Sequence, residues 1–198
     1  MKKSGFLIFG VLFFFASQTK AQSLHIGVKA GVNLAEINGR SFSGGFQAGF
    51  SAGGFVELGI NSNWTLQPEL LYTQTRATTS SEFPYASNPQ FYGIPNRTVS
   101  LNYINIPVLI SYKILPVLSI QAGPSLGILL STSQNIMTNN ANAFKTTDLL
   151  AVIGAQVNLG KVKFGARYSY GLADISAVTP SDTWTNQNIQ IYMGLRIF

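Results

Sequence analysis

Cysteine is absent from the 198-residue sequence, and histidine occurs once, at His25. The first absence excludes disulfides, thiolate metal sites, a cysteine nucleophile and a lipid anchor on cysteine. A general base is most often a histidine held by an orienting partner, and His25 has no acidic neighbour in its own segment. P-loop, zinc-ligand and dinucleotide-binding spacings are also missing. We therefore expect no enzymatic activity, no catalytic residue, no metal and no cofactor.

Charged residues are also scarce, since Asp, Glu, Lys and Arg make up 10% of the chain against 46% for apolar residues. An ordinary soluble domain is about one quarter charged, so part of this surface is expected not to face water. The formal charge is +6, but without Lys2, Lys3 and Lys20 the 10 basic and 7 acidic residues that remain leave +3. No basic cluster remains, and nucleic acid is therefore not an expected partner.

Residues 1–21 have the pattern of a secretory signal peptide. Lys2 and Lys3 form a positive start, residues 6–16 are an apolar stretch, and Thr19, Lys20 and Ala21 form a small-residue cleavage site. A transmembrane anchor is the alternative, but about 11 apolar residues are too few for the ~20 that span a bilayer as a helix. No later segment reaches that length. We expect an exported domain at 22–198 that, if integral to a membrane, is a barrel, the other fold that satisfies its backbone in lipid.

Apolar and polar residues alternate along eight segments, with the period of two that is typical of β-strands. These segments are 24–34, 46–60, 64–73, 99–112, 118–130, 148–159, 162–172 and 188–198. In the last segment, Ile189, Ile191 and Met193 share one parity, and Gln190 and Tyr192 share the other. The first segment alternates in the same way, so pairing between the two ends would close the sheet and protect its edges.

One segment departs from regular alternation. The apolar residues of 99–112 change parity between Tyr103 and Ile104. An extra residue in a strand shifts the following side chains to the other face. The change therefore predicts a β-bulge near these two residues.

Long and short connections alternate along the chain. Long polar segments lie at 36–45, 76–98, 131–147 and 173–187, and short turns lie at 61–63, 113–116 and 160–161. Outer-membrane barrels have an even number of strands, short periplasmic turns and longer external loops. The sequence therefore predicts an all-β protein, an eight-stranded antiparallel up-and-down transmembrane β-barrel in the outer membrane of a Gram-negative envelope, with outer-membrane lipid around it.

Alternation alone does not say which face points inward. A soluble periplasmic carrier of the lipocalin type would bury the apolar face around an apolar ligand. The other face is mostly Gly, Ser, Gln and Asn, which suits a narrow interior better than a water-exposed surface. Aromatic residues on outward positions or near strand ends would form the girdle of a membrane barrel: Trp64, Tyr72, Tyr103, Tyr112, Tyr168 and Tyr170. We therefore expect the apolar face in lipid, with the carrier as the alternative.

Charged residues on the polar face fall on segments that become neighbours when the barrel closes. They are Lys29, Glu57, Glu69, Lys163, Arg167 and Arg196. Buried charges must pair, and eight strands leave an interior just wide enough for side chains. The sequence thus predicts a lumen charge network that largely plugs the barrel. A narrow porin-like path for ions or small solutes is the alternative. Glu57 and Glu69 could also act as a catalytic carboxylate pair, but the nearby basic residues favour ion pairing.

Four segments carry a resemblance to a known family: LQPELLY at 66–72, LNYINIPVL at 101–109, QAGP at 121–124 and ARYSYGL at 166–172. Together they resemble the PorT-like small outer-membrane β-barrel family of Bacteroidota, commonly labelled porin-like. This resemblance implies an eight-stranded outer-membrane barrel without a generally assigned activity, and one type of member takes part in a protein-secretion machine. The terminal Phe198 resembles the signal that the barrel-assembly machinery recognises, which makes that machinery an expected partner.

Aromatic residues in the longest polar segment suggest where a partner would bind. Phe83, Tyr85, Phe91 and Tyr92 lie within 76–98. Loops on a rigid scaffold commonly carry binding. We therefore expect a structural or interaction role, in which the external loops contact a protein or a glycan, with conduction through the lumen as the alternative.

Overall fold

The computed structural model describes residues 23–81, 94–133, 143–177 and 183–198. The predicted signal peptide lies outside these residues, as do Phe83, Tyr85, Phe91 and Tyr92. Nine β-strands form in the described part of the chain: β1 (Leu24–Asn38), β2 (Phe42–Ser43), β3 (Gln47–Gly59), β4 (Trp64–Thr79), β5 (Thr98–Leu115), β6 (Leu118–Thr132), β7 (Thr147–Leu159), β8 (Val162–Gly171) and β9 (Thr185–Arg196). No helix among these residues is long and apolar enough to cross a membrane.

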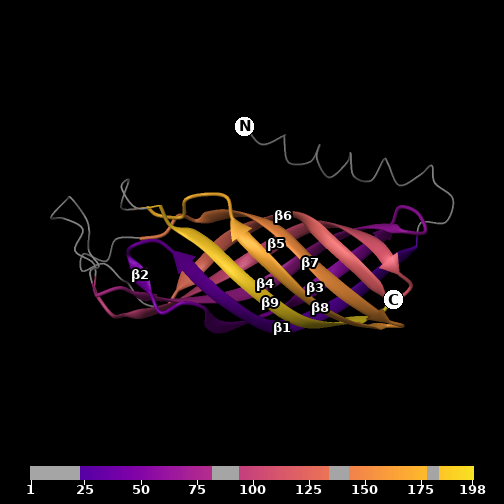
Figure 1. The fold of residues 1–198 in the computed structure, drawn as a ribbon, viewed down its shortest axis with the longest axis horizontal. Coiled ribbons are helices and arrows are strands. Elements are labelled where there is room, and N and C mark those ends of the chain that lie inside the picture. The colour runs from indigo at the N-terminus through magenta and orange to yellow at the C-terminus, as the bar shows by residue number, and fades with distance from the viewer. Residues whose placement is uncertain (1–22, 82–93, 134–142, 178–182) are drawn as a thin grey trace.

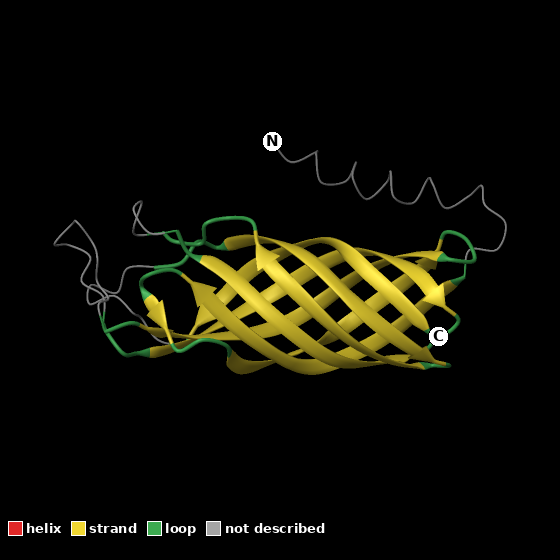
Figure 2. Cartoon of the chain, in the orientation of Figure 1, coloured by secondary structure: helices red, strands yellow, loops and turns green. Residues whose placement is uncertain are grey.

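Eight of these strands form the wall of a closed antiparallel barrel. Their order around the wall is β4, β3, β1, β9, β8, β7, β6 and β5, and β5 pairs with β4 to complete the ring. The two ends of the chain meet along β1 and β9, where Gly27 lies opposite Arg196 and Asn38 opposite Thr185. Figures 1 and 2 show these strands winding obliquely around one axis. The predicted fold is thus confirmed, including the pairing of its first and last strands.

The apolar face of the wall points outward. Ile153, Ile191 and Met193 are 62%, 57% and 58% exposed, whereas Gln121 and Arg167 on the opposite face are 1% and 3% exposed. Each of the eight wall strands pairs on both sides, so the backbone hydrogen bonds are satisfied within the wall. The lipocalin-like carrier required the apolar face inside, and this arrangement contradicts it.

The two ends of the barrel differ. At one, the turn end, short connections at 60–63, 116–117 and 160–161 join β3 to β4, β5 to β6 and β7 to β8. Asn61 Oδ1 accepts hydrogen bonds from the N–H groups of Asn63 and Trp64, both at 2.9 Å, which holds the first turn. Gly160 has a φ of +63°, a conformation that glycine adopts without strain. At the other, the loop end, the long connections gather (Figure 2).

Several strands are longer at the loop end than their alternation indicated. β1 reaches Asn38 and β4 reaches Thr79, so both run into segments predicted as loops, and β2 pairs with β4 inside the predicted loop 36–45. Thr73, Thr75 and Thr79 in this part of β4 are buried, and threonine favours a pleated, half-buried position. At the turn end, β5 continues to Leu115, so the predicted turn 113–116 is displaced to 116–117.

The final strand stops short of the chain end. β9 runs from Thr185 to Arg196 and not from 188 to 198. Ile197 still donates its N–H to the Ile26 carbonyl at 2.8 Å, and Ile26 donates to the Phe198 carbonyl at 3.0 Å. The last two residues are therefore tied to β1 without extending the strand.

The parity change in β5 does not arise from a bulge in that strand. Alternation continues unbroken: Val99, Leu101 and Tyr103 are buried inside, and Val108 and Ile110 lie outside. A register shift does occur between Asn102 and Tyr103, but their β6 partners are Ser131 and Leu129, so the extra residue, Leu130, belongs to β6. The apolar residues change face because the interior is apolar at the loop end. Tyr103 therefore does not belong to the outer aromatic girdle.

Candidate functional site

The centre of the lumen is organised around one buried carboxylate. Glu69 of β4 accepts hydrogen bonds on Oε1 from Lys29 Nζ, Gln67 Nε2 and Arg167 Nη2, each at 2.7 Å. Arg167 Nη1 donates to Glu69 Oε2 at 2.8 Å, so the arginine binds both oxygens. Such bidentate, charge-assisted pairs are among the stronger hydrogen bonds in proteins. Side chains from β1, β4 and β8 thus meet across the barrel axis.

Two neutral side chains extend this group to the remaining wall. Gln121 of β6 accepts Arg167 Nε at 3.0 Å and Nη2 at 2.7 Å, and donates to Gln67 Oε1 at 3.0 Å. The Tyr192 hydroxyl of β9 lies 3.1 Å from Gln121 Oε1 and 3.0 Å from Gln156 Oε1, both within hydrogen-bonding distance. The network therefore spans the interior from β4 to β9.

Aromatic rings cover the buried cations. Lys29 Nζ lies 4.0 Å from the centroid of the Tyr192 ring, and the Arg167 guanidinium carbon lies 4.6 Å from it. Phe55 has Lys29 Nζ at 5.6 Å and Lys163 Nζ at 5.9 Å from its centroid. These distances are in the range of cation–π attraction. The sequence analysis did not predict that Phe55 and Tyr192 cover the cations. Their parity does place them inside, because Phe55 shares the parity of Glu57, and Tyr192 shares that of Arg196.

A second group lies nearer the turn end. Glu57 of β3 pairs with Lys163 of β8 through Oε1 at 2.6 Å and with Arg196 of β9 through Oε2 at 3.0 Å. Lys163 Nζ also donates to Asn158 Oδ1 at 3.0 Å, and Gln156 Nε2 donates to the same oxygen at 2.7 Å. Because Gln156 also contacts Tyr192, the two groups form one hydrogen-bonded chain.

All six charged residues singled out in the sequence come together in these two groups. Two carboxylates, Glu57 and Glu69, face four cations, so cations outnumber acids in each group. Beside Arg167, toward the loop end, the free space is about 20 Å³, roughly the room that one water molecule occupies. Little free space is therefore left beside Arg167 among the described residues.

The interior of the loop end holds an apolar cluster, which we call the cap. Its buried members are Ile37, Ala77, Val99, Leu101, Tyr103, Ala143, Phe144, Ile175 and Trp184. Trp184 is fully buried and packs edge-on against Phe42 with the ring centroids 4.9 Å apart. Phe144 lies 5.5 Å from Trp184, and its backbone forms a bridge with Ser176. Described residues of the long connections thus form an apolar cluster inside this end of the barrel.

Asp174 fixes the segment that carries Trp184. Its Oδ1 accepts the N–H of Ser176 at 3.0 Å and the N–H of Trp184 at 2.9 Å, and Lys145 Nζ lies 3.2 Å from its Oδ2. Partial burial raises the pKa of this carboxyl, but the two N–H donors and Lys145 outweigh it, so the pKa lies below its usual value. The ionised side chain therefore stabilises the cap.

The candidate chemistry is that of ion pairing. The described residues contain no group of three or more His, Cys, Asp or Glu side chains that could hold a metal ion. His25 is half-buried at the turn end, away from the central carboxylate and beside Glu57, Lys163 and Arg196 at a polar cavity. These contacts suit a structural lock or a charged lining.

Comparison with known proteins gives a family and a fold. The family model for the outer membrane protein beta-barrel domain matches residues 16–177. Neisserial surface protein A is 16% identical, over 90% of this chain and 100% of its own, with a TM-score of 0.51. Ail from Yersinia pestis is 12% identical over 87% and 98%, with a TM-score of 0.49, and OprG from Pseudomonas aeruginosa is 11% identical over 90% and 97%, with a TM-score of 0.46.

At 16% identity, Neisserial surface protein A shows the fold and not a shared activity. Of the three TM-scores, the first alone exceeds 0.5. No curated protein matches the chain.

Proposed function

Since this chain belongs to the outer membrane protein beta-barrel domain family, we propose that it is an interaction protein with a plugged lumen that displays its external loops to a protein or glycan partner. The family and the fold make it an outer-membrane β-barrel protein. The loop end is then the external end and the turn end the periplasmic end.

Side chains that cross the interior at two levels support this proposal. Glu69, Arg167 and Gln121 join opposite walls through hydrogen bonds of 2.7–3.0 Å at mid-height. Above them, the cap places Trp184 and Leu101, both 0% exposed, inside the external end. An ion would have to break a buried charge pair and then cross an apolar layer, and each step is costly.

The base of the longest loop is pinned to the barrel, which supports a display role. Thr79 at the end of β4 donates its N–H to the Arg97 carbonyl at 3.0 Å and its hydroxyl to the Ile94 carbonyl at 2.7 Å. In the opposite direction, the Asn96 N–H donates to the Thr79 carbonyl at 3.1 Å. A segment anchored at both ends loses less conformational entropy when it binds. Phe83, Tyr85, Phe91 and Tyr92, which lie between the anchors, are proposed to contact the partner.

Export and assembly complete the proposal. The pattern of residues 1–21 supports cleavage of a signal peptide, and Phe198, which is 81% exposed, is accessible to the barrel-assembly machinery. The motifs at 66–72 and 101–109 support a PorT-like barrel of Bacteroidota within the wider family. The first of them contributes Gln67 and Glu69 to the central network.

Planar-bilayer recording tests whether the lumen is closed. We expect no current steps from the purified protein, because side chains fill the mid-section. Steps whose size changes in Arg167→Ala or Glu57→Ala would establish the channel alternative instead. Barrel integrity is checked by the difference in gel mobility between boiled and unboiled samples, since a closed barrel resists unfolding without heat.

A loop variant tests the display role. Replacing Phe83, Tyr85, Phe91 and Tyr92 together by serine removes the proposed contact surface and leaves the wall unchanged. We expect binding to a glycan array or to intact target cells to fall at least tenfold, with an unchanged heat-dependent mobility shift. Replacing Phe164, an outward residue of β8, by leucine is the matched control. Unchanged binding in the serine variant would contradict the proposal.

A further inference from the structure

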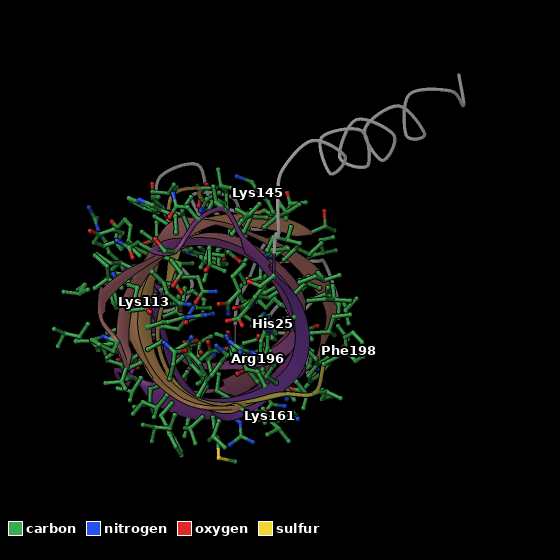
Figure 3. The ribbon with its side chains drawn as sticks, turned by 90° about the vertical axis from the view of Figure 1, so that its right-hand side faces the viewer. His25, Lys113, Lys145, Lys161, Arg196 and Phe198 are labelled. Atoms are coloured by element: carbon green, nitrogen blue, oxygen red, sulfur yellow. The ribbon has the colours of Figure 1, made fainter. Side chains whose placement is uncertain are left out.

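A cavity of about 430 Å³ opens at the turn end of the barrel. His25, Lys113 and Arg196 line it. Figure 3 shows His25 and Arg196 within the ring of strands and Lys113 at its rim, whereas Lys161 and Phe198 lie on its outside. The central network forms its floor through Gln156 and Asn158. Cavities of this size fall in the range that holds small-molecule ligands. We call it the vestibule.

The charge in the vestibule is unbalanced. Lys113, Lys163 and Arg196 line it, and Glu57 is the one carboxylate among its described lining residues. Both oxygens of Glu57 are already engaged, Oε1 by Lys163 at 2.6 Å and Oε2 by Arg196 at 3.0 Å. Three cations against one carboxylate leave an excess of two positive charges, before any contribution from His25. Low-dielectric walls focus such a field toward the mouth.

Two cations of the vestibule, Arg196 and Lys113, have donor capacity that no carboxylate uses. Arg196 Nε is buried and has no hydrogen-bond partner among the described residues. Arginine is otherwise favoured where a planar fork binds a carboxylate or phosphate. Lys113 reaches the rim, where its Nζ donates to the Ser62 carbonyl at 3.1 Å, a neutral acceptor that leaves the charge uncompensated. A buried, unpaired donor is costly unless something accepts from it.

We propose that the vestibule is a binding site for a small periplasmic anion that carries carboxylate or phosphate oxygens. The anion enters through the open turn end and lies against Arg196 and Lys113. Its oxygens accept charge-assisted hydrogen bonds, which are about twice as strong as neutral ones. The ligand neutralises the excess positive charge, so it is a dianion or trianion of the size of phosphate or citrate and not a cation or a neutral sugar.

Calorimetric titration of the full chain, folded in neutral detergent, tests this site with citrate and inorganic phosphate as probes. We expect saturable binding of at least one of them at a single site, in the presence of sodium chloride at matched ionic strength. Arg196→Gln and Lys113→Gln should each raise the Kd about tenfold, the effect of losing one charge-assisted hydrogen bond. Both variants should fold, because Glu57 keeps Lys163 as its partner in Arg196→Gln, and Lys113 lies at the exposed rim.

Lys161→Gln is the matched control, because it removes one positive charge from the same end of the barrel outside the vestibule. Its Kd should stay within about twofold of the parent value, since exposed charges are screened at physiological salt. Absence of saturable binding by both probes would overturn the proposal. Equal weakening in Lys161→Gln and Lys113→Gln would also overturn it, because attraction would then be a property of the whole end.

Discussion

Neutralising Glu69 isolates the energetic role of the central network. Glu69→Gln preserves the shape of the side chain but removes the charge that Lys29 and Arg167 share. The side chains of these two cations are 0% and 2% exposed, so water cannot replace the carboxylate. Breaking a buried ion pair by removing one partner costs about 3–5 kcal/mol. We expect the free energy of unfolding to fall by about that amount.

A matched variant and a second-site change separate this effect from general damage. Glu57→Gln removes the same charge nearer the mouth. There the Arg196 side chain is 28% exposed, so water can solvate part of its charge when the carboxylate is gone. Its expected cost is smaller, about 1–2 kcal/mol. Adding Lys29→Met to Glu69→Gln removes one of the two unpaired cations and should restore about half of the loss, since apolar replacements for buried charges are often tolerated.

Urea titration in neutral detergent, followed by gel mobility without boiling, measures all four proteins. The folded fraction at each urea concentration gives the midpoint and the free energy of unfolding. Equal stability of Glu69→Gln and the parent within about 1 kcal/mol would refute the argument. A double variant less stable than Glu69→Gln would also refute it, because Lys29 would then contribute by packing and not by its charge.

Three further predictions concern the cap and the wall. Trp184→Ala should destabilise the cap by about 3–5 kcal/mol, because it empties a fully buried aromatic site, and hydrogen exchange of the loop-end amides should rise while the wall stays protected. Folding lowers the pKa of Asp174, so its contribution to the stability of the cap is complete above the unfolded pKa of about 4 and is lost as pH falls through the folded pKa. Trp184 fluorescence should report this loss, and Asp174→Asn should remove the pH dependence. Gly165→Ala should lower the free energy of unfolding, measured by urea titration, by about 1–3 kcal/mol, because the added Cβ would overlap the Tyr192 ring. Gly54→Ala should be tolerated, because the nearest atom to its added Cβ lies 3.6 Å away.

The wall of the barrel was predictable because its two faces meet different surroundings. A period of two in Ile189, Ile191 and Met193 identifies a strand and an apolar face without any knowledge of its neighbours. The parity that separates Glu69 from Leu70 also assigns the charged residues to one face. Since eight strands enclose little space, charges on the inner face had to come within reach of one another.

The loop end was not predictable by the same rule, because there the interior itself is apolar. Val99, Leu101 and Tyr103 follow the inward parity, yet their apolar character resembles the outer face, and the apparent parity change was read as a bulge. Trp184 and Phe144 come from segments that looked like polar loops, and alternation carries no signal for them. Pairing within the network was equally hidden, because the charged partners of Glu69 lie 40 and 98 positions away in the sequence.

Pairing between β1 and β9 also constrains the order of folding. Gly27 and Arg196, which face each other in this pair, stand at nearly opposite ends of the chain. Closing so large a loop is entropically costly, and its hydrogen bonds form late compared with those of the hairpins. Until β9 arrives, both β1 and β8 present a bare edge, which other chains can pair with. Pairing of β9 with β1 and β8 is therefore expected to be the step that removes the last open edges of the wall.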